Sequence, residues 1–309
     1  MSVDDYYDSL STESKISLLR SELDDYAKFS SCLIREMRLF NISRKYTISE
    51  YEGYGFLLFQ EATIKICTLT KLSMGVNLYA QGCRRDITSL YSVLRSLIEL
   101  IFIFHNIYLT QDSLKEKEIV FSLWIIHGLL NRQKINAESE EQKEQQVQEK
   151  NQIEFEKSKI KQALSTMTLS ASAMKDVDRI LKKRDVSIVG YHFIKDAVDN
   201  VISIKEIYPS AIESEISHLN WGNLMYRQCC FHSHPSFLGL LQFKDMYTNK
   251  NDAEFLKEIL SFALNLYFVA IYIFCKSNSR AKQLAENINY DLITRVFNFI
   301  ESDIANINN

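Results

Sequence analysis

Glycine and proline are scarce in this chain, and that scarcity constrains its fold more than any other feature. Among 309 residues there are 8 Gly and 2 Pro. Sheets joined by tight turns need these residues at many of their reversals, so the sequence favours long helices. We predict an all-α helical bundle with a projecting charged helical hairpin. In this interpretation residues 1–309 form a single all-helical domain, and the charged excursion within it covers residues 131–186.

Apolar residues recur at helical spacing along most of the chain. Helices are predicted over residues 11–40, 47–75, 84–108, 112–129, 168–181, 187–204, 210–218, 220–233, 251–273 and 279–300. Residues 47–50 are a candidate capping box for the second helix, and Ser279 or a residue near it is expected to cap the last one. The helix over 84–108 is the most apolar in the first half of the chain, which predicts a central position.

The charged excursion differs sharply in composition from the rest of the chain. Residues 136–150 have almost no apolar residue and many strong helix formers. Such a segment has no apolar face to bury, so we expect a solvated helix or tether that the core fold does not need. Two basic clusters follow, at 157–161 and 182–184. They could meet phosphates, but solvated helix faces are the simpler explanation.

Two apolar runs are candidates for membrane spans. The run over 93–109 is interrupted by Arg95, Glu99 and His105. The run over 259–275 is cleaner, but it is shorter than the ~20 residues that a span needs. We therefore expect both runs to be buried core helices and expect no contact with a membrane.

Composition favours a reduced, cytoplasmic setting. The six cysteines show no metal-ligand spacing, and most lie within apolar helical patterns. Residues 1–7 are acidic and lack the basic-then-apolar order of a signal peptide. The net charge of -3 gives no general attraction to nucleic acid, so any such contact must be local. No cofactor or metal is expected.

Residues 221–237 combine two histidines, an arginine and two cysteines in a short apolar segment. In a helix, Arg227 and His234 are about two turns apart and project from one face, with Cys230 between them. His232 is rotated by roughly 140° from that face. His234 directly precedes Pro235, which predicts that the helix ends near Ser233 and leaves His234 accessible.

Arg95 and Glu99 form an i,i+4 pair inside the apolar helix over 84–108. An unpaired buried carboxylate is costly, so we predict that Glu99 is buried and paired with Arg95 or Arg227. The simpler interpretation of this pair is structural, an ion pair that fixes helix packing. Glycine-rich phosphate loops and the GxSxG and HExxH motifs are absent from the sequence. A thiol nucleophile at Cys229 or Cys230 lacks an identifiable third group to hold its base.

Three segments resemble a bacterial all-helical family catalogued only as a domain of unknown function. They are residues 78–85 with 94–99, the tryptophan Trp221, and Tyr226-Arg227 followed by residues 234–236. In that family the first segment contains leucine-arginine-serine and a glutamate, here ending at Glu99. The last contains tyrosine-arginine, a serine, and histidine-proline-serine. Cys230 replaces that serine here, so a hydroxyl role at this position is not supported.

The spacing is also similar to that of HEPN ribonucleases of toxin and phage-defence systems. These helical enzymes carry an arginine followed by four to six residues and a histidine. Both Arg227 with His232 and Arg227 with His234 match. The resemblance implies metal-independent RNA cleavage, a homodimer and a partner protein from the same defence system. Arg95, Glu99, Tyr226 and Cys230 would then support the site.

A second function class remains open from the sequence. The arginine, glutamate and histidine residues could only fix the packing of a non-catalytic helical interaction or ligand-sensing protein. The patterns are short, and an arginine–histidine pair at this spacing is common by chance. The two hypotheses differ in whether Arg227 and His234 act on RNA.

Overall fold

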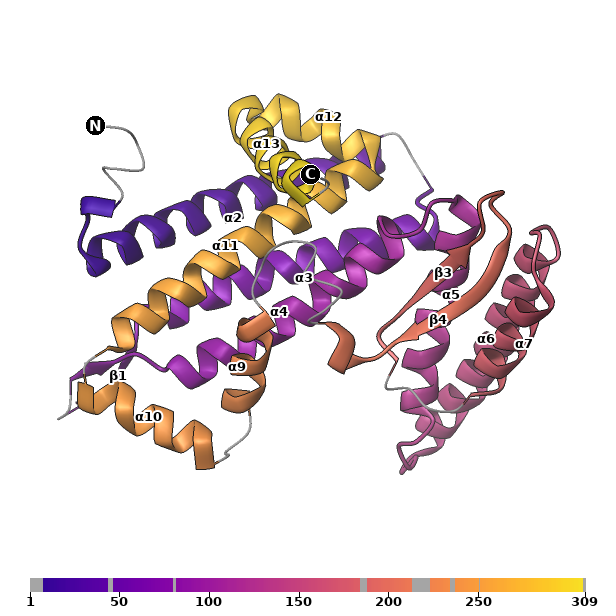
Figure 1. Ribbon diagram of the computed structural model, residues 1–309, viewed down its shortest axis with the longest axis horizontal. Coiled ribbons are helices and arrows are strands. Elements are labelled where there is room, and N and C mark those ends of the chain that lie inside the picture. The colour runs from indigo at the N-terminus through magenta and orange to yellow at the C-terminus, as the bar shows by residue number, and fades with distance from the viewer. Residues whose placement is uncertain are drawn as a thin grey trace. The chain divides into compact units, whose positions relative to one another are not determined.

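Figure 1 shows a computed structural model of the chain, in which helices dominate. The structure describes residues 8–43, 47–79, 82–183, 188–212, 223–233, 237–249 and 251–307. Within these ranges it has eleven α-helices and two small two-stranded sheets, which confirms the predicted all-α class. The chain divides into two compact units, residues 1–102 with 213–309 and residues 103–212. The predicted excursion over 131–186 falls within the second unit.

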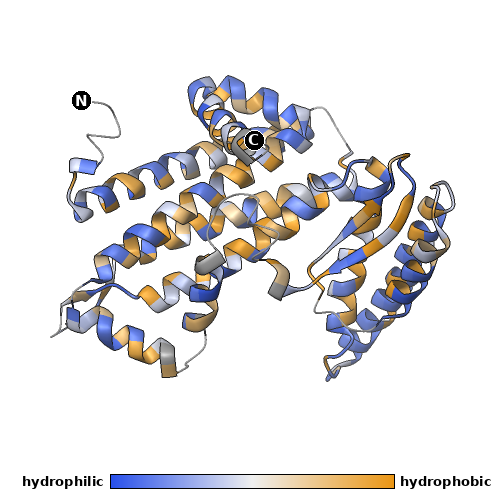
Figure 2. Ribbon diagram, in the orientation of Figure 1, coloured by the Kyte–Doolittle hydropathy of each residue, from blue (hydrophilic) through white to orange (hydrophobic). Residues whose placement is uncertain are grey.

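The first unit is built around one long helix. α11 (Asp252–Ser277) packs against α2 (Thr12–Ser43), α3 (Glu50–Leu72), α12 (Ser279–Ile288) and α13 (Tyr290–Ile307). From Ala263 onward most of its residues are buried, and Figure 2 shows that apolar residues dominate this part. An α-helix that is apolar on all sides must be covered on all sides. The other four helices provide that cover.

Aromatic side chains fill the core around α11. Phe59 of α3 stacks on Phe274 with ring centroids 4.3 Å apart and planes inclined by 6°. The Tyr267 side chain is fully buried, and its hydroxyl donates to Thr63 Oγ1 at 3.0 Å. This hydrogen bond satisfies the polar group that burial of a tyrosine removes from water. The predicted core role of the run over 259–275 is therefore confirmed.

The remaining elements of the first unit carry the candidate site. A short hairpin, β1 (Val76–Asn77) and β2 (Cys83–Arg84), precedes α4 (Ile87–Tyr108). α9 (Asn223–Ser233) is followed by α10 (Phe237–Asn249), which leads to α11. The boundary between the two units falls within α4, after residue 102.

Most of the predicted helices agree with the structure to within a few residues, but one cap and one helix division differ. Ser49 caps α3, accepting from the Glu52 backbone N–H while the Glu52 carboxylate accepts from the Ser49 N–H. The predicted capping box at 47–50 was therefore misplaced by two residues. Asn278, directly beside Ser279, caps α12, which agrees with the cap predicted at or near Ser279. The last predicted helix is two helices, because α12 ends before Asn289 and α13 begins after it.

The second unit combines three helices and a hairpin. α5 (Leu114–Arg132) packs on α6 (Glu140–Leu164), while α7 (Ala171–Lys182) packs on β4. β3 (Gly190–Lys195) and β4 (Val201–Ile207) are antiparallel partners. The helix predicted over residues 187–204 is therefore wrong. The signal for a strand was the alternation in β3, where Tyr191 and Phe193 are buried and His192 and Ile194 are exposed.

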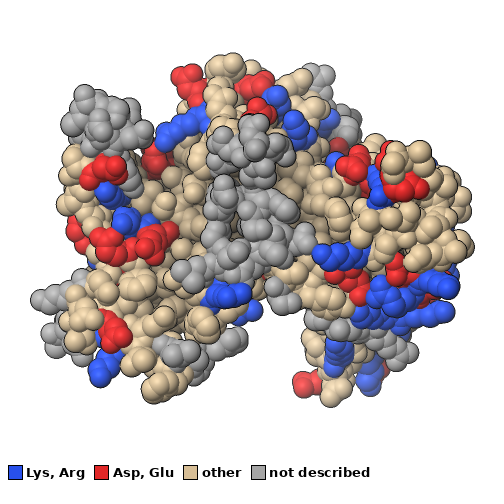
Figure 3. All heavy atoms as spheres, viewed as in Figure 1, with Lys and Arg blue, Asp and Glu red and all other residues tan. Residues whose placement is uncertain are grey.

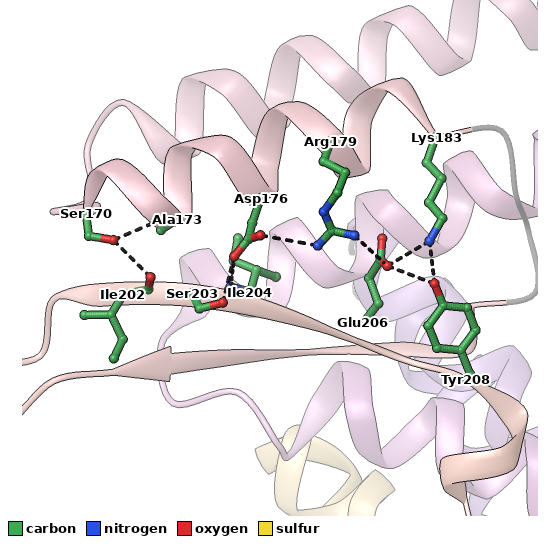
Figure 4. Close-up of polar contacts among 10 residues, drawn as sticks. All are labelled: Ser170, Ala173, Asp176, Arg179, Lys183, Ile202, Ser203, Ile204, Glu206 and Tyr208. Atoms are coloured by element: carbon green, nitrogen blue, oxygen red, sulfur yellow. Dashed lines mark hydrogen bonds and ion pairs between the residues drawn. The ribbon is translucent and has the colours of Figure 1, made fainter.

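α7 covers the outer edge of β4 (Figure 4). The Asp176 carboxylate accepts from the Ser203 hydroxyl at 2.7 Å and from the Ile204 backbone N–H at 3.1 Å. The Ser170 hydroxyl, just before α7, donates to the Ile202 carbonyl at 3.0 Å. An exposed strand edge invites pairing with another chain, and these side chains occupy the groups that such pairing would use.

Farther along the same edge, two cations meet one buried carboxylate (Figure 4). Arg179 and Lys183 each lie 2.8 Å from Glu206 Oε2, and the Tyr208 hydroxyl donates to the same oxygen at 2.9 Å. Burial raises the pKa of Glu206, but the hydrogen bonds from Lys183, Arg179 and Tyr208 lower it by more. The carboxylate therefore stays ionised and locks α7 to β4.

Lys and Arg side chains gather over α6 and α7 on the face that Figure 3 shows. Many of them are paired with carboxylates. Lys157 and Lys159 lie 2.7 and 2.8 Å from Glu154 and Glu156, and Arg179 and Lys183 bind Glu206. Intramolecular ion pairs thus account for much of this basic surface.

α6 corrects the prediction of a segment that buries nothing. It packs on α5 through one stripe of buried residues: Glu149, Ile153, Glu156, Ile160 and Leu164. Their spacings of three or four residues place them on one face. Arg132 of α5 lies 2.9 Å from Glu149 Oε1, which partners one of the buried carboxylates. We therefore no longer expect the core fold to tolerate removal of the charged excursion.

Two described helices are long and apolar enough to cross a membrane, α4 and α11. In the most apolar window of each, 50% of α4 and 78% of α11 is buried within the protein. Core helices of water-soluble proteins pass the same test of length and composition. The extensive burial of α11 by neighbouring helices is typical of such a core helix.

The packing of α6 predicts a large effect of a single truncation. Ile160→Ala should lower the free energy of unfolding of the second unit by about 2–4 kcal/mol, because it opens a cavity against α5. Val147→Ala on the exposed face of the same helix should change it by less than about 0.5 kcal/mol. Chemical denaturation followed by circular dichroism and limited proteolysis measures both. Equal stability of the two variants would contradict the packing.

Candidate functional site

A row of polar residues on α4 faces α9. Tyr91, Arg95 and Glu99 are four residues apart in sequence, which aligns them along one side of α4. Each interacts with a residue of α9. The two helices are therefore joined by polar contacts along their length, and this row is the place where the predicted site residues meet.

Glu99 joins the two helices at one end of the row. Its Oε1 atom lies 3.0 Å from Arg95 Nε and accepts from the Tyr226 hydroxyl at 3.1 Å. Burial lowers the pKa of Arg95, while the hydrogen bond to Glu99 raises it, and the net change is upward. The pKa of Tyr226 is raised, first by burial and then by Glu99. Tyr226 therefore remains a neutral donor to a charged ion pair.

The prediction for Glu99 is confirmed in one respect and wrong in another. Its partner is Arg95, one of the two cations expected from the sequence. Its side chain is not buried, because 37% of it is exposed. Since that exposure leaves the carboxylate partly hydrated, the pair is not the buried ion pair that the apolar context predicted.

The two adjacent cysteines occupy different environments. Cys229 is fully buried, and burial raises the pKa of its thiol above the usual range. Because the thiolate is the nucleophilic form, this raised pKa disfavours Cys229 as a nucleophile. Cys230 is half-buried and lies close enough to Arg95 and Tyr226 to influence both electrostatically. Cys230 therefore lies beside the polar row, on the α9 side of the interface.

His232 is packed into the helix interface. Only 4% of it is exposed, and its ring stacks on Tyr91 with centroids 4.5 Å apart and planes inclined by 5°. Burial lowers the pKa of His232, although a hydrogen bond with Gln242 of α10 opposes that effect. A neutral, stacked imidazole is well suited to hold α4, α9 and α10 together.

Arg227 lies on the opposite side of α9 from His232. It is exposed whereas His232 is buried, which confirms the rotation expected from a five-residue separation. The described part of α9 runs to Ser233, and the helix end predicted from Pro235 stays a prediction because residues 234–236 lie outside the described residues. His234 and Trp221 lie outside the described residues.

Two residues of this interface were not predicted from the sequence. Tyr91 was counted only as part of an apolar helix, and Gln242 received no role. The signal for Tyr91 was its position four residues before Arg95, which aligns it with the polar row. No local pattern marks Gln242, since its contact with His232 depends on how α10 folds back.

Among the described residues, no group of three His, Cys, Asp or Glu side chains is arranged to hold a metal ion. No protein-family model, no curated protein and no solved structure matches the chain.

The environment of His232 predicts a pH dependence of stability. Its folded-state pKa is lowered, so below about pH 6.5 the unfolded chain binds a proton that the folded chain does not. Stability should be fully present above about pH 6.5 and fall as the pH is lowered through that value, so the interval to measure runs from about pH 7.5 to about pH 5.5. His232→Gln should lose less stability over that interval, because glutamine does not titrate. Thermal melts of both proteins across the interval measure the difference, and parallel curves would contradict it.

Proposed function

We propose that this protein is a HEPN-like, metal-independent endoribonuclease in which Arg227 and His234 are the catalytic pair. The observation that carries this assignment is the opposite exposure of Arg227 and His232 on α9. Two arginine–histidine spacings occur in the sequence. Since His232 is buried in a stack with Tyr91, it is a positioning residue, and the pair is formed by Arg227 and His234.

The proposed reaction is an internal attack on the RNA backbone. His234 accepts the proton of a 2′-hydroxyl, and that oxygen attacks the adjacent phosphorus. The bond from phosphorus to the 5′-oxygen breaks, and this oxygen takes up a proton. The products are a 2′,3′-cyclic phosphate and a 5′-hydroxyl. Arg227 stabilises the negative charge that develops on the phosphate oxygens.

The polar row supports this role by fixing α9. Tyr226 precedes Arg227 in the chain, and its hydroxyl is held by Glu99, which Arg95 holds in turn. A catalytic arginine must keep its position relative to the phosphate, because small displacements are costly for catalysis. Glu99, Arg95 and Tyr226 are therefore proposed as positioning residues, with Cys230 packed beside them.

Exposed apolar side chains lie on either side of the catalytic segment in the sequence, at the end of α9 and along α10. We call them the α10 surface, and its members are Phe231, Phe237, Leu240, Leu241 and Phe243, each at least 41% exposed. Large apolar patches of this kind often mark protein interfaces. We propose that the α10 surface forms a homodimer that brings two copies of Arg227 and His234 together in the cytoplasm. A partner protein of a toxin or phage-defence system would regulate it.

The same surface also favours the second candidate, a non-catalytic helical interaction or ligand-sensing protein. In that case α10 would bind a partner, and the polar row would only hold α4 against α9. The two candidates differ in what happens to RNA and are separated by the cleavage experiment below.

Cleavage of a mixed RNA pool in the presence of a chelator tests the catalytic pair. Arg227→Ala and His234→Ala should each reduce cleavage by about 100-fold or more, because each removes a group from the transition state. Arg35→Ala and His192→Ala, which change an exposed arginine and an exposed histidine elsewhere, should cleave like the wild type.

His232→Ala should lower the melting temperature.

Folding of each variant is checked by circular dichroism. Wild-type protein that leaves RNA intact under every condition, including with the products of neighbouring genes, would favour the interaction protein. If His234→Ala cleaves normally, the assignment of the pair is wrong.

Sedimentation analysis tests the homodimer. Leu240→Glu should shift the protein toward the monomer, because a charge would be buried at the centre of the interface. Leu57→Glu, at a similarly exposed leucine of α3, should leave the dimer unchanged. A wild-type protein that remains monomeric across the accessible concentration range would contradict the proposed dimer.

A further inference from the structure

The backbone conformation of the β1–β2 hairpin depends on one glycine. Val76 pairs with Arg84, and Asn77 pairs with Cys83. Gly75 has φ +91°, and a Cβ there would lie 2.7 Å from Cys83 Sγ and 2.9 Å from the Arg84 carbonyl oxygen. Only glycine fits this close approach of backbone and side chain. The glycine at position 75 therefore fixes how closely the chain before β1 packs against β2.

Tyr79 occupies an unusual conformation near the tip of this hairpin. Its φ is +53°, in the left-handed region that a bulky residue rarely adopts. Its N–H donates to Asn77 Oδ1 at 3.0 Å, and its carbonyl accepts from the Gly82 N–H at 3.2 Å. The residue is 94% exposed, so little packing offsets the strain. Backbone strain that no packing interaction offsets is often found at ligand-binding positions.

Basic residues follow Tyr79 along the hairpin, ahead of the first carboxylate at Asp86. Residues 70–85 contain three basic residues and no aspartate or glutamate. Arg85 is engaged by Glu13 at 2.7 Å and Asp252 at 3.3 Å. The Arg84 side chain is exposed, and its charge acts on the Tyr247 hydroxyl. A protruding aromatic ring thus lies on the same short hairpin as an exposed guanidinium.

We propose that the β1–β2 hairpin binds single-stranded RNA, with one unpaired base stacked on Tyr79 and a neighbouring phosphate bound by Arg84. Aromatic rings stack on bases of any identity, and arginine binds phosphate, so the two groups together recognise a single strand. This inference rests on the proposed function and specifies its substrate as unpaired RNA. The exposed Met74, Val76 and Leu78 enlarge the apolar part of the surface.

α10 connects this hairpin to the catalytic segment. The Tyr247 hydroxyl, near the end of α10, donates to the Arg85 carbonyl directly after β2. The start of α10 follows α9, which carries Arg227. Thirteen residues of helix span about 20 Å, a distance that a few nucleotides of extended strand can cover. The hairpin can therefore hold a strand whose cleavage site lies at α9.

Fluorescence anisotropy with a 2′-O-methyl RNA of about 20 nucleotides tests this proposal without cleavage, because the probe lacks the attacking hydroxyl. Tyr79→Ala should weaken binding by roughly 5- to 100-fold, whereas Tyr79→Phe should stay within about twofold of the wild type. Arg84→Ala should weaken binding and reduce its salt dependence. Tyr290→Ala and Arg35→Ala, at exposed positions of the same unit, are the matched controls.

Tyr79→Gly separates binding from folding. Glycine adopts positive φ without strain, so this variant should melt at the same temperature as the wild type or higher while binding RNA weakly. Wild-type affinity of Tyr79→Ala, or equal weakening by Tyr290→Ala, would overturn the proposal. The proposal would also be overturned if the wild-type protein shows no binding to the RNA probe and instead sediments with phosphatidylserine vesicles. Failure of the proposed function would be seen in a different experiment, the cleavage assay, in which unmodified RNA would stay intact.

Discussion

Burial of the apolar helix α11 is the constraint on which the first unit depends. Most of its residues from Ala263 to Cys275 are buried, and such a helix is stable in water only when neighbours cover every side. α2, α3, α12 and α13 provide this cover. The candidate site belongs to α4 and α9, which polar contacts join. A rigid core beside a polar interface is a suitable support for exposed catalytic groups.

The sequence was sufficient to predict the helices whose apolar residues follow a helical period. α2, α3, α4, α5 and α11 lie close to their predicted places. The β3–β4 hairpin was missed because its isoleucines and valines also suit a buried helix, and only the alternation around Tyr191 and Phe193 distinguishes it. α6 was misjudged because its acidic first half hides the sparse stripe of Ile153, Ile160 and Leu164.

The candidate site was partly predictable for a similar reason. Arg95 and Glu99 form a local pair, so helical spacing alone predicted their contact. The opposite exposure of Arg227 and His232 also followed from spacing along one helix. The stack of His232 on Tyr91 and the exposure of Glu99 depend on how α9 and α10 pack on α4. Such long-range contacts have no signature in a local pattern, and His234 lies outside the described residues.

The most direct test of the central claim is the chemistry of the RNA ends left after cleavage in a chelator. Attack by the 2′-hydroxyl predicts products ending in a 2′,3′-cyclic phosphate and a 5′-hydroxyl, detectable by mass spectrometry. It also predicts that 2′-O-methyl substitution at the cleaved nucleotide abolishes the reaction. Products with 3′-hydroxyl and 5′-phosphate ends, or cleavage of the 2′-O-methyl strand, would contradict the account.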